Sequence, residues 1–239
     1  MAEEIILSFC VPIYNEAEIL IPQIGKIKKN LEKIIGSNQF EILIIDNGSI
    51  DNTPVILKQI HDTSIRIFRL PSRGHGLAYK KGLQHAKGQW IVLSAIDLPF
   101  GFEDLRKAKK LWKDYDIIYG SKSHPGSIIL VPFSRKVASS FYNLFLRLLL
   151  GNTISDTQGS VFIRRTAFTK ISSHCTAKNA FFTAQIAIYG KKANAKIAEV
   201  PVKYNAILGR KSKYKIFRDG AEMFSSIIRE VFLLQTPQR

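Results

Sequence analysis

Glu41-Ile-Leu-Ile-Ile-Asp-Asn-Gly-Ser-Ile-Asp-Asn-Thr53 is the stretch that decides the fold. Its first half is apolar up to Asp46, and Asn47-Gly48 follows at once. An unbroken apolar run is typical of a strand that is buried on both faces of a parallel sheet, and Asn-Gly predicts a turn. Open α/β sheets bind ligands in the crevice at the carboxyl ends of their strands. We therefore expect Asp46 to lie where a sugar, a base or a metal would be met.

The composition suits one sizeable α/β domain. The chain has 239 residues, of which 46% are hydrophobic. Cys10 and Cys175 match no zinc or redox spacing, and we interpret them as reduced structural thiols of an intracellular protein. The N-terminus lacks the pattern of a signal peptide, and no run of about 20 apolar residues offers a membrane span. These features lead us to expect a cytoplasmic protein.

The net charge of +16 favours an anionic partner. Nucleic acid, acidic lipid and a phosphorylated substrate all fit such a charge, and a generally basic protein without such a partner is the alternative. The aromatic residues lie mostly within apolar runs and do not alternate with Lys and Arg as stacking platforms would. We therefore expect no nucleic-acid partner.

Strands and helices alternate through the first half of the chain. Strands are expected at 5–11, 41–46, 65–70, 90–95 and 116–119, and helices at about 19–35, 53–61, 74–86 and 103–112. Asn15 with Glu18 resembles a capping box at the start of the first helix. This alternation is typical of a Rossmann-like, doubly wound, mostly parallel central sheet with flanking helices.

The second half is less regular. We expect an apolar helix at 134–150, a short strand at 160–164, a helix at 180–189, a strand at 195–204 and an amphipathic helix at about 215–234. The predicted division is a domain at 1–208, with one half at about 1–120 and a second half at about 121–208. A basic loop and the C-terminal helix at 209–239 follow.

Seven short motifs occur in one order between residue 5 and about residue 215. They are Val11-Pro-Ile-Tyr-Asn-Glu16, Ile45-Asp-Asn-Gly-Ser49, Gly74-His-Gly-Leu-Ala78 with Gly82, Ala95-Ile-Asp-Leu98, Tyr119-Gly-Ser-Lys122, Asp156-Thr-Gln-Gly159, and Glu199-Val-Pro-Val202 followed by Ser212-Lys213. Together they resemble the family-2 glycosyltransferases of the GT-A fold, and more narrowly the polyprenyl-phosphate sugar transferases. The resemblance implies an inverting enzyme that moves a hexose from a UDP- or GDP-sugar to a polyprenyl or dolichyl phosphate. It also implies that the half at about 1–120 binds the nucleotide sugar and that the half at about 121–208 binds the acceptor.

The resemblance also implies which residues bind the nucleotide sugar. Backbone turns at strand ends suit a diphosphate, because glycines allow close approach and free amides face the ligand. Asp46 is expected to hydrogen-bond the base, and Arg210 and Lys213 belong to a basic loop that closes over the diphosphate. The alternatives are a turn-forming role for Asp46 and an ordinary charged loop. The other implied nucleotide-sugar residues are Pro12, Tyr14, Asn15, Glu16, Asn47, Gly48 and Gly74.

The implied metal site departs from the family pattern. Relatives carry an Asp-x-Asp pair that binds Mg²⁺ or Mn²⁺, but Ala95 replaces the first acid and leaves Asp97 as the expected catalytic and metal-binding residue. Pro99 also occupies a position where some relatives place a polar ligand. One carboxylate still binds a metal that is held mainly by phosphates and water, so we expect a weakly held ion. The alternative is a catalytically weakened or inactive homologue that binds the ligands as a partner subunit.

Lys122, Arg135 and Ser139 form the implied site for the acceptor phosphate. Lys122 replaces an arginine of relatives and lacks its bidentate fork, whereas Arg135 and Ser139 are four residues apart and share a helix face. Asp156 is the second expected catalytic residue, and it positions the acceptor first and acts as a base second, because a phosphate is already ionised near pH 7. We expect Asp46, Asp97 and Asp156 to open onto one cleft.

Two further expectations concern the membrane and the helix at 180–189. Val137–Leu150 with its aromatic, leucine and basic residues fits an interfacial helix, and a buried core helix is the alternative. We expect a peripheral protein at the cytosolic face of a membrane, helped by its positive charge, and a membrane-embedded subunit is a further expected partner. Thr183 and Gln185 stand where relatives often carry acids.

Overall fold

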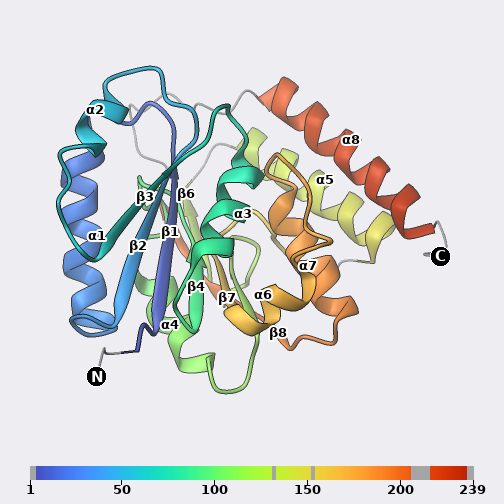
Figure 1. Ribbon diagram of the computed structural model, residues 1–239. Coiled ribbons are helices and arrows are strands. Elements are labelled where there is room, and N and C mark those ends of the chain that lie inside the picture. Colours follow the sequence, from blue (N-terminus) through green and yellow to red (C-terminus); the bar gives the residue numbers. More distant parts are fainter. Residues whose placement is uncertain (1–3, 131–132, 152–153, 206–215, 236–239) are drawn as a thin grey trace.

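A single twisted sheet forms the centre of the molecule (Figure 1). The computed structural model describes residues 4–130, 133–151, 154–205 and 216–235. The seven strands lie in the order β3 (Ile65–Arg69), β2 (Phe40–Asp46), β1 (Leu7–Ile13), β4 (Trp90–Leu93), β7 (Val161–Arg164), β5 (Ile117–Ser121) and β8 (Ile197–Pro201). β7 runs antiparallel to β4 and β5, whereas β3, β2, β1 and β4 pair in parallel, as do β5 and β8. The predicted mostly parallel, doubly wound sheet is confirmed.

Helices cover both faces of this sheet, and the sheet separates two hydrophobic cores. One core contains residues of α1 (Leu20–Ile34), α2 (Thr53–Leu57) and α4 (Glu103–Leu111). The other contains residues of α3 (His75–His85), α6 (Arg165–Ile171) and α7 (Phe182–Lys192). Because both faces are covered, every residue of β2 is buried, which explains its unbroken apolar sequence up to Asp46.

Several element boundaries differ from the sequence-based prediction. β1 begins at Leu7 and runs to Ile13, two residues later than expected at each end, and α2 ends at Leu57. The expected strand at 195–204 divides into β8 and β9 (Lys203–Asn205), and β9 pairs in parallel with β6 (Ile128–Leu130) in a small second sheet. The expected division after residue 208 lies outside the described residues and stays a prediction.

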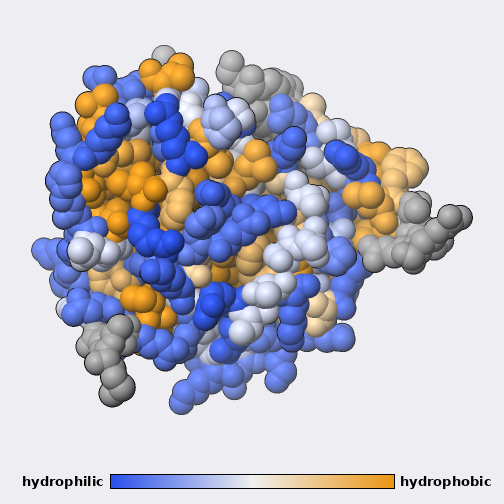
Figure 2. Space-filling view, in the orientation of Figure 1, coloured by the Kyte–Doolittle hydropathy of each residue, from blue (hydrophilic) through white to orange (hydrophobic). Residues whose placement is uncertain are grey.

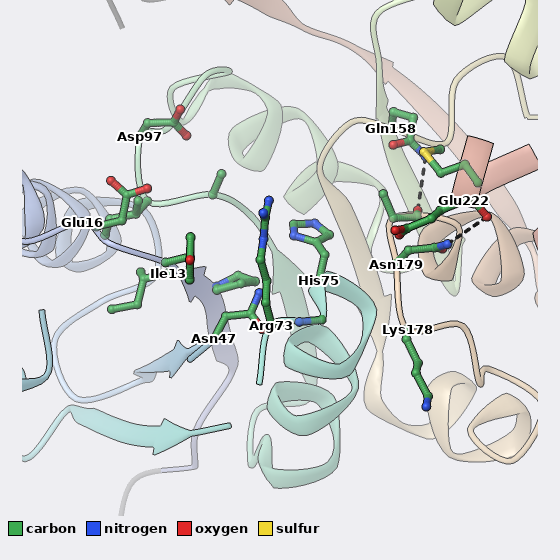
Figure 3. A pocket seen from close by; sticks show the side chains of 17 residues that line it. Ile13, Glu16, Asn47, Arg73, His75, Asp97, Gln158, Lys178, Asn179 and Glu222 are labelled. Carbon is green, nitrogen blue, oxygen red and sulfur yellow. Dashed lines mark hydrogen bonds between the residues drawn. The ribbon is translucent and has the colours of Figure 1, made fainter. Parts of the chain in front are cut away.

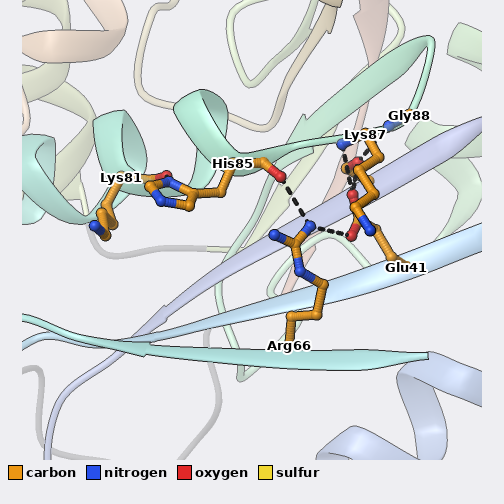
Figure 4. A network of polar contacts seen from close by, with 7 residues as sticks. Glu41, Arg66, Lys81, His85, Lys87 and Gly88 are labelled. Carbon is orange, nitrogen blue, oxygen red and sulfur yellow. Dashed lines mark hydrogen bonds and ion pairs between the residues drawn. The ribbon is translucent and has the colours of Figure 1, made fainter. Parts of the chain in front are cut away.

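A polar network ties the strands together at the end of the sheet away from their carboxyl tips (Figure 4). Glu41 is buried, and its carboxylate accepts hydrogen bonds from the Ser8 hydroxyl at 2.6 Å and the Lys87 amide at 2.6 Å. The Arg66 guanidinium pairs with the same carboxylate at 2.7 Å and donates to the carbonyl of His85. Since partners satisfy both oxygens of Glu41, we assign this buried acid to the stability of the fold.

A third layer lies beyond α7 and consists of α5 (Phe133–Leu150) and α8 (Ile216–Gln235) (Figure 1). Leu146 of α5 and Ile227 of α8 pack with residues of α7 in a small core. The rings of Phe145 and Phe224 meet edge to face at 5.2 Å across the two helices. This layer therefore packs on α7 through a small hydrophobic core, and its two helices also contact each other.

The outer surface of this layer is apolar. Figure 2 shows hydrophobic residues gathered at the edge of the molecule where α5 and α8 lie in Figure 1. Over its described side chains, α5 is therefore no buried core helix. Among the described residues, none of the helices has the length and apolarity needed to cross a membrane. The exposed apolar residues are Phe141, Leu144, Phe145, Leu148 and Leu149 on α5, and Phe224, Ile228, Phe232 and Leu233 on α8.

Candidate active site

A cavity of about 690 Å³ lies at the carboxyl ends of β1, β2 and β4 (Figure 3). In this view Glu16 and Asp97 lie on one side, Gln158, Asn179 and Glu222 lie on the other, and Arg73 and His75 stand between them. The lining residues are Pro12, Ile13, Tyr14, Glu16, Asn47, Arg73, Gly74, His75, Ala95, Ile96, Asp97, Gln158, Lys178, Asn179, Ala180, Glu222 and Met223. Because both polar and apolar atoms line it, the cavity is suited to a ligand with a ring and charged groups.

The loop after β1 is fixed by hydrogen bonds to the loop after β2. The Asn15 amide donates to the Ser49 hydroxyl at 2.9 Å, and the Asn15 side-chain oxygen accepts from the Ile50 amide at 2.9 Å. Asn15 has a positive φ of 54°, in the left-handed region that Asn tolerates better than most residues. The expected capping box is wrong, because the Asn15 side chain bonds to this second loop and α1 begins only at Leu20, without a side-chain cap.

Asp46 is buried next to Asn47, which lines the cavity, but Asp46 itself does not line it. Its carboxylate is 1% exposed, accepts a hydrogen bond from the Ser49 amide at 2.9 Å and lies 3.4 Å from the Arg69 guanidinium. The expectation that this acid opens onto the cleft is wrong. Asn47 is the neighbour that lines the cavity, and its side-chain oxygen accepts from the Gly74 amide at 2.7 Å.

Gly48 and Gly74 shape the loops beside the cavity. Gly48 has a φ of +77°, and a Cβ there would lie 3.2 Å from the Ser72 backbone. Gly74 itself lines the cavity and precedes the first residue of α3. Both glycines therefore lie in the region that the sequence indicated, and they let the 72–74 segment approach the turn after β2.

Asp97 and Ala95 line the same part of the cavity after β4. Among the described residues, no three His, Cys, Asp or Glu side chains group together as a metal site. Glu16 lies near Asp97 on the same side of the cavity (Figure 3).

Asp156 is fully buried, and both oxygens of its carboxylate accept hydrogen bonds from neighbouring residues. One oxygen accepts from the Lys122 amide at 2.9 Å and lies 2.7 Å from the Lys122 ammonium, while the other accepts from the Gln158 amide at 3.0 Å. The Lys122 ammonium also lies 5.8 Å from the centre of the Phe100 ring. The expectation that Asp156 itself opens onto the cleft is wrong, because Gln158 lines the cavity in its place.

Two glycines allow the segment that carries Asp156 to cross the end of β5. A Cβ on Gly159 would lie 1.6 Å from the carbonyl oxygen of Gly120, a distance that no side chain tolerates. The backbone amide of Gly120 donates to the carbonyl of Ser160 at 2.9 Å. This close crossing places Lys122 beside Asp156.

Four predicted site residues lie outside what the structure describes. Arg210 and Lys213 belong to the undescribed segment 206–215, and the side chains of Arg135 and Ser139 are not described although both residues belong to α5. Of the acceptor residues, the structure therefore describes the surroundings of Lys122 alone. The roles expected for the other residues stay predictions.

Sequence reasoning missed one wall of the cavity. Lys178, Asn179 and Ala180 come from the loop before α7, and Glu222 and Met223 come from α8. A local signal was present at Gly76, because a Cβ there would lie 2.2 Å from the carbonyl oxygen of Ala177. That glycine marks a close approach of α3 to this loop, but the sequence alone does not identify the approaching segment.

Comparisons with known proteins agree with this geometry. The model of the family "Glycosyl transferase family 2" matches residues 8–172. Glycosyltransferase AglD of Haloferax volcanii is 27% identical over 232 residues, which cover 93% of this chain and 36% of AglD. The chain therefore spans about a third of the length of that relative.

Two further proteins extend the comparison. The dolichyl-phosphate beta-glucosyltransferase of Dictyostelium discoideum is 30% identical over 251 residues, which cover 95% of this chain and 74% of the relative. A crystal structure of glucosyl-3-phosphoglycerate synthase from Mycobacterium tuberculosis, in complex with Mn²⁺, UDP and phosphoglyceric acid, superposes with a TM-score of 0.62 at 15% identity. That match covers 98% of this chain and 80% of the synthase and shows a shared fold.

Proposed function

The chain belongs to glycosyl transferase family 2, and on this premise we propose that it transfers a hexose, with inversion, from a UDP- or GDP-sugar to a polyprenyl or dolichyl phosphate. One observation carries the proposal: residues of the loops after β1 and β2 line the same cavity as Asp97 and Gln158. The relative from Dictyostelium discoideum is named for transfer to dolichyl phosphate, which supports the choice of acceptor.

The donor occupies the side of the cavity that is formed by the strand tips. Pro12, Tyr14 and Asn47 face the base and ribose, and the exposed Arg73 side chain is a cation that lines the same cavity. The Arg73 guanidinium lies 5.0 Å from the centre of the Tyr14 ring, which fixes both side chains. A positive group at this position stabilises a diphosphate.

The residues present fit a metal ion that the substrate helps to hold. Asp97 would bind Mg²⁺ or Mn²⁺, and the phosphates of the donor and water would supply the remaining ligands. A bound ion would neutralise the negative charge on the leaving diphosphate. Since Ala95 offers no ligand, we expect the ion to bind weakly without the nucleotide sugar.

The acceptor phosphate enters beside Lys122. One of its oxygens attacks the anomeric carbon, and the carbon–oxygen bond forms as the bond to the nucleoside diphosphate breaks, with the electron pair leaving on the diphosphate. The attacking oxygen is already ionised near pH 7, so no protein base has to accept a proton. Asp156 therefore acts as a positioning residue, because its carboxylate holds the Lys122 ammonium and the Gln158 amide in place.

The protein works at a membrane surface. The apolar outer faces of α5 and α8 lie on one layer of the molecule, and a polyprenyl chain is confined to the bilayer. Helices with such faces lie in the interface between headgroups and acyl chains, and a net charge of +16 favours an anionic leaflet. We place this surface at the cytosolic face of a membrane, where a membrane-embedded subunit is a further candidate partner.

Ala95 favours a second candidate function. A homologue without the first acid could bind nucleotide sugar and lipid phosphate without transferring the sugar and act as a partner subunit. The other expected site residues of the β1 and β2 loops are present, and for this reason we rank transfer first.

One experiment tests the proposal and its alternative. The protein is incubated with radiolabelled UDP- and GDP-sugars, a short-chain polyprenyl phosphate and a titration of Mg²⁺ or Mn²⁺, and the mixture is extracted into organic solvent. Label in the organic phase that depends on the polyprenyl phosphate supports the transferase. Binding of a nucleotide sugar without transfer at any metal concentration would support the inactive partner. The absence of both binding and transfer would refute the assignment of this cavity to a nucleotide sugar.

A further inference from the structure

The C-terminal helix α8 has two opposite faces with different surroundings. Met223, Ile227 and Glu230 are buried on one face, whereas Phe224, Ile228 and Phe232 are exposed on the other. Residues three and four positions apart share a helix face, so both sets follow one helical period. The inner face of α8 meets the cavity and the loop before α7.

This inner face forms part of the cavity wall (Figure 3). Glu222 and Met223 of α8 line the cavity beside Asn179 and Ala180. The Asn179 side-chain amide donates to the hydroxyl of Ser226 at 2.9 Å and to the carbonyl of Glu222 at 3.2 Å. The position of Asn179 therefore depends directly on α8.

A second set of hydrogen bonds fixes the same loop at its other end. The Gln185 side-chain oxygen accepts from the amides of Thr176 and Ala177 at 2.9 and 2.7 Å. With its oxygen used in this way, Gln185 turns its amino group toward Glu230 of α8 and donates at 2.8 Å. Glu230 is 2% exposed and also accepts from the Tyr189 hydroxyl. A carboxylate of α8 therefore holds Gln185 and, through it, the 176–177 end of the loop.

The chemistry of this wall differs from that of the strand tips. Gln158 and Asn179 present carboxamides, and the Gln158 amide donates to the carbonyl of Ala180 at 3.3 Å. The Lys178 side chain extends away from Asn179 and Glu222 (Figure 3). Carboxamides and carbonyls bind hydroxyl groups by hydrogen bonds, and the Glu222 carboxylate of the same wall accepts from hydroxyl groups but repels phosphate. This wall therefore suits a sugar better than a diphosphate.

We propose that this wall faces the transferred sugar, an inference that rests on the proposed function. Ser226 and Glu230 of α8 are then positioning residues that hold the wall in place. Ser226 holds Asn179, and Glu230 holds the 176–177 end of the same loop through Gln185. The nucleotide lies at the opposite wall, beside Pro12, Tyr14 and Asn47. Contact with the sugar therefore depends on α8, and contact with the nucleotide does not.

Ser225 and Ser226 provide a matched pair of variants. Both hydroxyls donate to the carbonyl of Glu222, at 2.9 and 2.8 Å, but only Ser226 accepts from Asn179. We would measure the affinities of the wild type, Ser225→Ala and Ser226→Ala for UDP and for UDP-glucose by calorimetry with Mg²⁺, and repeat the series with GDP and GDP-mannose. Ser226→Ala should weaken the sugar-linked ligand about fivefold, as expected for one hydrogen bond, and change the affinity for the bare nucleotide less than about twofold. Ser225→Ala should leave both affinities unchanged.

Glu230 gives an independent check. Glu230→Ala should weaken binding of the nucleotide sugar selectively, and Glu230→Gln should recover part of the loss because its amide oxygen still accepts one hydrogen bond. Equal losses for nucleotide and nucleotide sugar, or no loss in Ser226→Ala, would overturn this inference alone. A wild type that binds neither class of ligand would overturn the proposed function and the inference together. The serine pair decides the question even if Glu230→Ala does not fold.

Discussion

At the scale of single residues, the surroundings of Asp156 restrict its chemistry. Its carboxylate is fully buried and receives the Lys122 amide, the Lys122 ammonium and the Gln158 amide. A carboxylate that is fully buried and whose two oxygens both accept from protein donors does not contact a substrate directly. Its effect on transfer must therefore pass through the position of Lys122.

Replacement of Asp156 by Asn should separate the two substrates. The variant loses the ion pair to Lys122, so kcat/KM for the polyprenyl phosphate should fall at least about tenfold. The dissociation constant of the nucleotide sugar should change by less than about threefold, because the strand-tip loops are untouched and asparagine still offers a side-chain oxygen to the Gln158 amide.

The matched control for this variant is Asp116→Asn, which removes an ion pair to Arg164 at the opposite end of β5. It should leave both constants near their wild-type values. Equal losses of donor and acceptor affinity in Asp156→Asn would contradict the assignment.

Asp104 predicts a measurable pH dependence of stability. This α4 side chain is buried and accepts a hydrogen bond from the Ser160 hydroxyl at 2.6 Å. Burial raises the pKa of its carboxyl from 3.8 to about 6, so the folded protein binds the proton more tightly than the unfolded chain. The stabilising contribution is complete below the unfolded pKa and is lost as the pH rises through the folded pKa.

The expected loss between about pH 4 and pH 7 is about 3 kcal/mol of unfolding free energy. Urea unfolding of Asp104→Asn across this range should lack this decline, whereas Asp114→Asn, at an exposed position, should follow the wild type. A variant Asp104→Asn with an unchanged pH profile would refute the prediction.

The residue scale is also where sequence prediction reached its limit. Asp97 was expected at the cavity and lies there, because the end of an apolar strand predicts its position. A capping box at Asn15 and an Asp46 that opens onto the cleft were wrong expectations, since the partners Ile50 and Arg69 become neighbours only when β1, β2 and β3 pair. Local sequence patterns identify a turn but not the loop against which it folds.

At the scale of elements, Gly76 joins α3 to the loop before α7. The Gly76 amide donates to the carbonyl of Lys178 at 2.9 Å, and an added Cβ would meet backbone oxygens of Ala177 and Asn179 at 2.2 and 2.7 Å. Backbone atoms at such distances cannot move aside as a flexible side chain would. The contact of α3 with the cavity loop therefore requires glycine.

Gly76→Ala should destabilise the fold by about 1–3 kcal/mol, the usual range for overpacking. Gly25 lies in the interior of α1 and has nothing within 4 Å of an added Cβ, so Gly25→Ala should stabilise the fold by about 0.5–1 kcal/mol through helix propensity. Urea unfolding measures both changes. The same sign of effect for both variants would show that the close approach at Gly76 does not govern its stability.

The order of elements was predictable from the sequence to different degrees. The buried strands β1, β2 and β4 and the helices α1, α3 and α4 follow from apolar runs and helical periods, which are local properties. The antiparallel direction of β7 was not predictable, because a short apolar strand carries no information about its neighbours. The contribution of α8 to the cavity was missed for the same reason, since its amphipathic pattern fits a helix on any apolar surface.

At the scale of the whole molecule, the outer surface of α5 and α8 exposes many large apolar side chains. Leu148 of α5 is 72% exposed and Phe232 of α8 is 65% exposed. Large contiguous apolar patches mark sites of interaction. Their place on one layer of helices supports contact with a lipid surface.

Leu148→Asp and Phe232→Asp should each weaken binding to vesicles of phosphatidylcholine and phosphatidylserine at least about tenfold, because each removes an exposed apolar side chain that would enter the lipid and adds a negative charge. Val55→Asp is the matched control, since Val55 of α2 is 58% exposed on another part of the fold. Sedimentation with vesicles at two salt concentrations measures the effect. Equal binding of all three variants would rule out this surface as the lipid contact.

The antiparallel strand in the middle of the sheet has a consequence for synthesis of the chain. β4 ends at Leu93, but its second neighbour β7 begins only at Val161, and β5 has no partner until β7 and β8 exist. A growing polypeptide on the ribosome therefore exposes the apolar edge of β4 until β7 at Val161–Arg164 has emerged. Such edges associate with one another, so a gene cut near residue 120 would encode an aggregating fragment and not an autonomous nucleotide-binding unit.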